Sequence, residues 1–237
     1  MYSSHEMDRV LASIRSAWEG QPDLPLATLF AMAANAGIGW GAANDMLVQF
    51  MSQQAANFVP QLSTDELALG GSYLLSLSNG RLVTVTPLYV VVRQEGDFQP
   101  VLWRWSGLRT TRPGAMLTLN DEDGYSHNLG IVRRISALRS GAKTHSCTLS
   151  KPDEFSVDSP VLSDDIGNDV FVSRLTDGST VVVGRLATVW AKKRRSLNTE
   201  TLRWKEIASL TPLVFKLRDG GERHYADVDK VIQVESD

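Results

Sequence analysis

The 237-residue sequence has little of the residue types that catalytic and metal sites use most. It contains one cysteine, Cys147, and four histidines, His5, His127, His145 and His224. A single cysteine excludes an internal disulfide and a zinc site built from several cysteines, and is typical of a reducing compartment. The N-terminus lacks a basic segment followed by an apolar core, so we expect a cytoplasmic protein without a signal peptide.

Catalytic and cofactor motifs are also absent from the sequence. It has no G-x-S-x-G elbow, no H-E-x-x-H pair and no phosphate-binding G-x-x-x-x-G-K-[ST] loop. The glycine-rich segment 37–41 follows a predicted helix, whereas a dinucleotide loop follows a strand. His145 and Cys147 alone supply too few ligands for zinc, and the acidic segment 164–169 lacks the spacing of a calcium loop. We therefore predict no catalytic residue, no metal and no cofactor.

Charge is scarce at the N-terminal end. No charged residue lies between Asp23 and Asp45, and residues 1–69 hold only two basic side chains, Arg9 and Arg15, against seven acidic ones. The uncharged stretch is rich in alanine and interrupted by glycine and asparagine, so two short helices fit it better than a membrane span. The net charge of −3 favours neither nucleic acid nor membrane as a partner.

Helical periodicity dominates the first 69 residues. Apolar residues recur at helical spacing over 7–20, 25–35 and 42–57, and Ser63 to Glu66 forms a capping-box pattern that predicts a short fourth helix. We expect these helices to form a domain over 1–69 whose apolar face pairs with another copy of the chain. The residues predicted for this self-association are Leu26, Leu29, Phe30, Met46, Phe50 and Met51.

The rest of the sequence predicts one small β unit that occurs twice. Asn79-Gly80 and Asp177-Gly178 each precede an apolar strand, and a tryptophan follows 25 or 26 residues after the glycine. The sequence therefore predicts an α+β protein in which the helical domain precedes two tandem antiparallel, barrel-like modules, at 70–137 and 170–237. A polar linker is expected over 138–169.

Two parts of the sequence resemble known families. Trp18, the run Pro22-Asp23-Leu24, Leu26 and Leu29 are similar to a W-x-x-x-P-D-L pattern in short helical domains of uncharacterised bacterial and phage proteins, although Pro25 stands where that pattern often has arginine. The turn at Asp177-Gly178 with Gly184-Arg185-Leu186 resembles SH3-like or Sm-like barrels. In the first module, Leu74 through Leu88 and then Trp105-Ser106-Gly107-Leu108 resemble a bacterial pleckstrin-homology-type sheet. These resemblances imply binding modules for peptides, nucleic acids or lipid headgroups, without choosing among them.

His127 and His224 stand at similar places in the two modules, each after an aspartate, Asp121 or Asp219. An enzyme using either histidine is one alternative. A half-exposed histidine hydrogen-bonded to the turn is the simpler interpretation, because two residues lack the third group of a catalytic set.

Basic residues supply the second alternative, a protein associated with nucleic acid. Arginine and lysine beside aromatic residues can contact phosphates and bases, but the same residues also occur on solvated strand edges. The candidate contacts are Lys192, Lys193, Arg194, Arg195, Arg133 and Arg134. Alternation along the strand places Trp103 and Trp105 on the side opposite Arg104, which favours core tryptophans. The favoured hypothesis is a non-catalytic binding or assembly protein whose partner is another protein or a second copy in a homo-oligomer.

Overall fold

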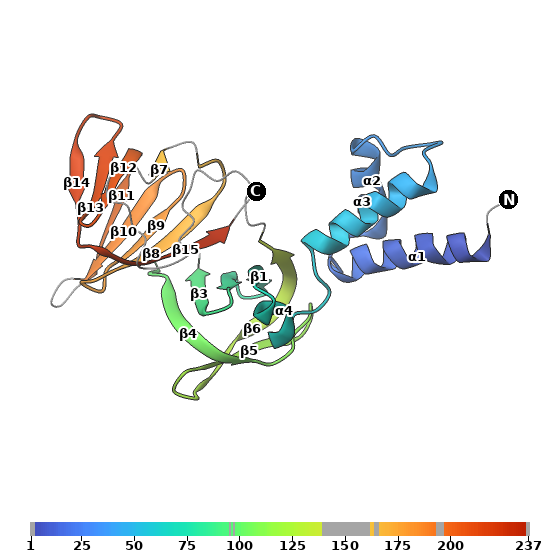
Figure 1. The fold of residues 1–237 in the computed structure, drawn as a ribbon, viewed down its shortest axis with the longest axis horizontal. Coiled ribbons are helices and arrows are strands. Elements are labelled where there is room, and N and C mark those ends of the chain that lie inside the picture. The colour runs from blue at the N-terminus through green and yellow to red at the C-terminus, as the bar shows by residue number, and fades with distance from the viewer. Residues whose placement is uncertain are drawn as a thin grey trace. The chain divides into compact units, whose positions relative to one another are not determined.

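The computed structural model describes residues 3–94, 96, 98–138, 162–163, 166–192 and 197–235. It confirms the predicted α+β order, with helices first and antiparallel sheets after them (Figure 1). The chain divides into two compact units, each of which is described separately below. Met1–Gln94 and Trp103–Leu138 form the first unit, and Glu95–Leu102 and Arg139–Asp237 form the second.

Four helices open the first unit, and they begin where the sequence supplies caps. The Ser3 hydroxyl accepts a hydrogen bond from the Glu6 amide at 3.2 Å, and the capping box of Ser63 and Glu66 is formed as predicted. Among the described residues, none of the helices is both long and apolar enough to cross a membrane. The helices are α1 (Ser4–Glu19), α2 (Leu26–Asn35), α3 (Asn44–Asn57) and α4 (Thr64–Ala68).

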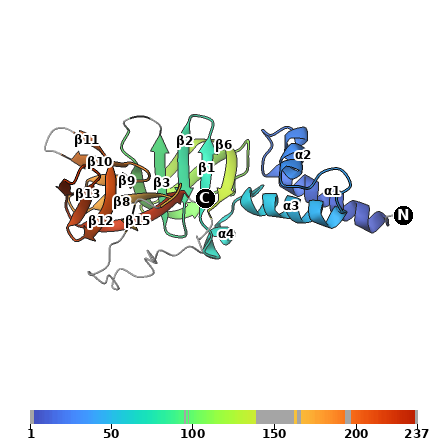
Figure 2. The ribbon, with the colours of Figure 1, turned by 90° about the horizontal axis from the view of Figure 1, so that it is seen from above.

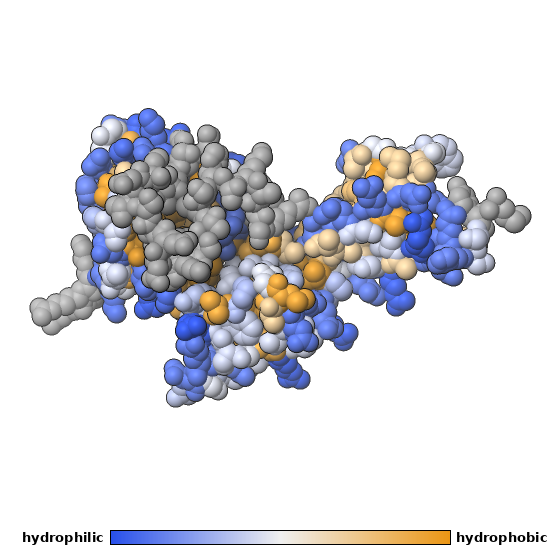
Figure 3. Space-filling view, viewed as in Figure 1, coloured by the Kyte–Doolittle hydropathy of each residue, from blue (hydrophilic) through white to orange (hydrophobic). Residues whose placement is uncertain are grey.

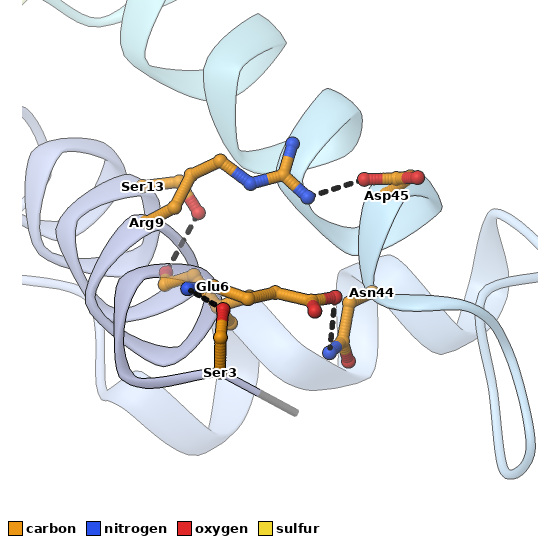
Figure 4. Close-up of polar contacts among 7 residues, drawn as sticks. Ser3, Glu6, Arg9, Ser13, Asn44 and Asp45 are labelled. Carbon is orange, nitrogen blue, oxygen red and sulfur yellow. Dashed lines mark hydrogen bonds and ion pairs between the residues drawn. The ribbon is translucent and has the colours of Figure 1, made fainter. Parts of the chain in front are cut away.

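Helices α1 and α3 run side by side in the same direction (Figure 2). At their N-terminal ends Arg9 pairs with Asp45, and the Asn44 amide donates to Glu6 at 3.4 Å (Figure 4). At the other end, a Cβ atom on Gly20 would lie 1.8 Å from the carbonyl oxygen of Phe58. Only glycine allows this approach of the two backbones.

The residues predicted for self-association instead build much of the core of α1–α3. Leu29 and Met51 are fully buried together with Ala17, and Leu26 and Phe50 pack against them. Only Phe30 and Met46 of the predicted set remain exposed. The six residues therefore do not share one outward face, because three short helices bury their best apolar side chains against one another first.

The first β module is a closed barrel in which each strand pairs with the next and the last pairs with the first. Its strands are β1 (Tyr73–Leu77), β2 (Arg81–Val85), β3 (Tyr89–Gln94), β4 (Val101–Leu108), β5 (Met116–Asp121) and β6 (Ser126–Ala137). The barrel confirms the predicted barrel-like architecture. Alternate side chains point inward and form a leucine- and valine-rich core.

Residues 58–69 belong to this barrel by their contacts, whereas the sequence grouped them with the helices. Leu62 and Leu67 are fully buried in the barrel core. Backbone bridges join Phe58 to Ser136 and Leu62 to Thr111. The segment that contains α4 therefore completes the hydrophobic core of the barrel.

The second β module consists of a five-stranded sheet ordered β11-β10-β9-β8-β15 and a four-stranded sheet ordered β14-β13-β12-β7. Only Arg203 separates β11 from β12, and residues 225–227 separate β14 from β15, so the chain turns from one sheet to the other at these two corners. The strands are β7 (Leu162–Ser163), β8 (Val170–Leu175), β9 (Thr180–Val183), β10 (Ala187–Lys192), β11 (Leu197–Leu202), β12 (Trp204–Leu210), β13 (Leu213–Leu217), β14 (Glu222–His224) and β15 (Val228–Glu235).

The two modules share one strand path. β1, β2 and β3 correspond to β8, β9 and β10, and β5 corresponds to β13. The long strands β4 and β6 each correspond to a bent pair, β11–β12 and β14–β15. The first and last members pair in both modules.

Irregular details recur as well, and they are harder to attribute to chance than a strand order. A β-bulge follows Trp105 in β4 and Trp204 in β12. A second bulge lies at corresponding positions where the first strand of each module pairs with the last, in the β1–β6 pair and in the β8–β15 pair. The indole N–H of Trp105 donates to the Thr86 carbonyl at 2.8 Å, and that of Trp204 donates to the Gly184 carbonyl at 2.9 Å. Thr86 and Gly184 each follow the second strand of their module. The internal duplication predicted from the turns and tryptophans therefore holds in three dimensions.

The two histidines, however, are not equivalent. Leu119 pairs with His127, and the corresponding Phe215 pairs with Arg223. His224 is one step further along and corresponds to Asn128. By the same register the counterpart of Asp121 is Leu217. Adjacent residues of a strand face opposite sides, so the two histidines point to opposite faces of their modules.

Candidate functional sites on the two modules

A polar cluster lies where β4, β5 and β6 meet in the first module. His127 Nε2 is 2.8 Å from Asp121 Oδ2, and the His127 ring lies 5.2 Å from the Trp103 ring, centroid to centroid. The backbone amide of Tyr125 donates to Asp121 Oδ1 at 2.8 Å, which ties the carboxylate to the β5–β6 turn. The simpler sequence interpretation, a part-exposed histidine bonded to the turn, describes this geometry.

The electrostatics of the cluster favour a charged carboxylate. The hydrogen bond from His127 lowers the pKa of Asp121 below its ordinary value. Desolvation opposes this to a lesser degree, and the Tyr125 amide adds a still smaller effect in the lowering direction. Asp121 therefore accepts hydrogen bonds as an anion at neutral pH.

Trp103 adds an unused donor to this cluster. Its indole nitrogen is buried, and none of the residues that the structure describes accepts a hydrogen bond from it. Trp105, two residues along the same strand, does have a partner in Thr86. Both tryptophans pack against the barrel core, as alternation predicted, while Arg104 lies over the Tyr89 ring and pairs with Glu122 at 3.3 Å.

The second module carries a different polar cluster at the corresponding place. The Tyr225 hydroxyl donates to Glu200 Oε2 at 2.9 Å, and Arg223 Nε lies 3.1 Å from Glu200 Oε1. Burial and the negative charge of Glu200 raise the pKa of Tyr225. By the shared register, Arg223 stands where His127 does and Leu202 where Trp103 does. The residue-type pattern did not single out Glu200 or Tyr225, because neither belongs to a known motif.

The predicted basic contacts are divided between the first unit, the second unit and residues outside the described part of the chain. Arg133 pairs with Asp23 at 3.2 Å and so links the barrel to the segment before α2, and the Arg134 guanidinium lies over the ring of Phe58, the residue that follows α3, at 5.3 Å. Lys192 ends β10 and is exposed. Lys193, Arg194 and Arg195 lie outside the described residues, as do His145 and Cys147.

His224 is exposed and pairs with Glu222 at 3.3 Å, and Asp219 Oδ1 accepts the Gly221 amide in a turn. Within the described part of the chain, no three His, Cys, Asp or Glu side chains gather in a way that could hold a metal ion. No protein-family model, curated protein or solved structure matches the chain.

Proposed function

We propose that this protein is a non-catalytic binding and assembly protein, in which each β module presents its own interaction surface and the helical segment pairs with a second copy. The observation that carries the proposal is the contrast between what the modules share and where they differ. The tryptophans, glycine turns and bulges recur, while the polar clusters at corresponding positions do not.

Shared framework residues keep a fold, and divergent surface residues set what that fold binds. Trp103, Asp121 and His127 give the first module an aromatic and anionic surface. Glu200, Arg223 and Tyr225 give the second a surface with a cation, an anion and a phenol. Neither set combines a nucleophile, a base and an orienting group, since His127 and Asp121 have no nucleophile beside them in the cluster, and this supports binding over the alternative of an enzyme using His127 or His224. The proposal includes that each module binds its partner as SH3-like or pleckstrin-homology-like domains do.

A photo-crosslinking amino acid placed at position 127 or at position 223 of the full chain tests the two surfaces. In an extract of the source cells, we expect each position to give a discrete adduct, and the two adducts to differ. Trp40, a fully exposed residue between α2 and α3 that belongs to neither cluster, provides a control position. If positions 127 and 223 give no adduct beyond that of the control, the proposal that the modules are binding surfaces fails.

Nucleic acid stays a second candidate partner because exposed Lys192 leads directly into Lys193, Arg194 and Arg195. Phosphate contacts release counterions, so such binding must weaken steeply with salt. Fluorescence anisotropy with a labelled oligonucleotide at about 50 and 200 mM salt measures this; for several phosphate contacts we expect a loss of about tenfold or more. Affinity that does not change with salt, or no binding at the lower concentration, removes this candidate.

A further inference from the structure

Helix α1 has one broad apolar face, and only part of it is covered. The covered part holds Ala17, which is fully buried against α2 and α3, and Ile14, which packs beside it. The adjoining part holds Met7, Leu11 and Trp18, whose exposed fractions are 51%, 63% and 42%. At 3.6 residues per turn these three side chains lie within about 40° of one another around the helix. They form what we call the outer stripe of α1.

The helical segment displays apolar residues on its surface among polar ones (Figure 3). The outer stripe differs from scattered exposed residues because it follows one helix at the spacing used for helix pairing. The Trp18 indole is held by a hydrogen bond from its N–H to the Leu24 carbonyl at 2.8 Å. Less side-chain freedom is therefore lost when a partner covers it.

Charges beside the stripe identify the occupant. Asp8 and Arg15 are seven residues apart, lie on the same side of the stripe and are exposed. A second α1 running antiparallel, with Met7 opposite Trp18 of the other copy, brings each Asp8 to within about 3 Å, along the axis, of the other copy's Arg15. The interaction occurs twice because the contact is two-fold symmetric. In a parallel two-fold pair the sides that carry Asp8 and Arg15 would lie on opposite flanks of the contact, so these charges would not meet.

We propose that the outer stripe of α1 binds the same stripe of a second copy of this chain, with the two helices antiparallel. This rests on the assembly function proposed above and names its surface. Arg15 already contacts Glu19 through Nε at 2.9 Å, yet its side chain is 80% exposed, so its remaining guanidinium nitrogens can meet Asp8 of the other copy. One helix stripe buries less than the roughly 800 Å² per partner of a standard interface, so we expect a dissociation constant in the micromolar range.

Sedimentation velocity of the full chain over about 1–200 µM measures the association. We expect the wild type to dimerise. Asp8→Arg and Arg15→Asp each create two like-charge contacts and should weaken dimerisation by about tenfold or more. The double variant D8R/R15D restores opposite charges and should return the dissociation constant to within about threefold of wild type. Leu11→Asp, at the centre of the stripe, should abolish dimers over this range.

Met46→Asp is the matched control, since Met46 is an exposed apolar residue of α3 outside the stripe. It should leave dimerisation unchanged, and thermal melts by circular dichroism within about 3 °C of wild type show that each variant is folded. A wild type that stays monomeric throughout overturns the assembly function. A wild-type dimer that Leu11→Asp leaves intact, or a double variant that does not regain dimerisation, leaves assembly standing and overturns the outer stripe as its surface.

Discussion

At the scale of single residues, Trp105 and Trp204 explain why the duplicated modules keep the same bulge. Each indole N–H reaches the carbonyl that follows the second strand, and so ties the fourth strand, or its counterpart β12, to the turn after the second. A buried carbonyl left without a donor costs free energy, so the position demands an aromatic ring with an N–H. This is a physical reason for tryptophan at both places.

Replacing Trp204 by phenylalanine should therefore lower the free energy of unfolding by about 2–3 kcal/mol, through loss of the hydrogen bond and of buried volume. Trp105→Phe should cost less, about 1–2 kcal/mol, because Trp105 is only partly buried. Urea unfolding followed by circular dichroism measures both. The control Trp40→Phe, at a fully exposed position, should change stability by less than about 0.5 kcal/mol. Equal effects of Trp40→Phe and Trp204→Phe would contradict the role assigned to the indole.

Asp121 provides a titration to test. Its pKa is lowered first of all by the hydrogen bond from His127, so the carboxylate stabilises the fold above about pH 4, and this stabilisation is lost as the pH falls through the lowered pKa. In His127→Ala the pKa of Asp121 should rise toward the ordinary value of 3.8. Carbon-detected NMR titration of the side-chain carboxyl measures it, with Asn128→Ala on the opposite face as the control. An unchanged pKa would mean that the turn amides alone hold the carboxylate.

The equivalence of the tryptophans and of the glycine turns in the two modules could be predicted from the sequence, because each has a local signature. It paired His127 with His224 incorrectly, since matching by residue type followed the two histidines. The glycine turns give the true register: Gly124 and Gly220 both have φ above +80° and occupy the same turn position. When these two turns are aligned, Arg223, and not His224, corresponds to His127. The clusters around Trp103 and Glu200 depend on contacts between strands, which no local pattern contains.

At the scale of elements, the junction of α1 and α3 depends on one glycine. Gly20 ends α1 directly against the Phe58 carbonyl, and Phe58 in turn bridges to Ser136 in β6. In the sequence, Gly20 is only the last residue of the helix predicted over 7–20. Its close approach to a residue 38 positions later in the sequence became visible only in the folded chain.

Gly20→Ala should destabilise the protein by about 2–4 kcal/mol, because the added methyl group meets backbone atoms that cannot rotate away. Gly39→Ala is the matched control: a Cβ atom there meets nothing within 4 Å, and its φ is not in the left-handed region. It should be neutral or slightly stabilising. Thermal unfolding of the two variants compares them directly, and a neutral Gly20→Ala would show that the junction is looser than its geometry indicates.

At the scale of the whole molecule, the order of helices, first module and second module follows from periodicity and turn residues, and the structure confirms it. The boundary near residue 69 differs for a physical reason. Gly70-Gly71 marks a break in local structure, so the sequence placed α4 with the helices. Core membership is decided by burial, and the side chains of Leu62 and Leu67 are buried among barrel residues.

Leu67→Ala tests whether the barrel needs this segment. Leu67 is fully buried, so the substitution leaves a cavity in the barrel core and should lower stability by about 2–4 kcal/mol. Hydrogen exchange measured by mass spectrometry should show lost protection across β1 to β6. Leu69→Ala is the control, since Leu69 is 89% exposed and should cost less than about 0.5 kcal/mol. If Leu67→Ala instead lowers protection only in α4 and leaves the barrel strands unchanged, then residues 58–69 pack against the barrel without being needed for its stability. The boundary at residue 69 would then be the better division of the chain.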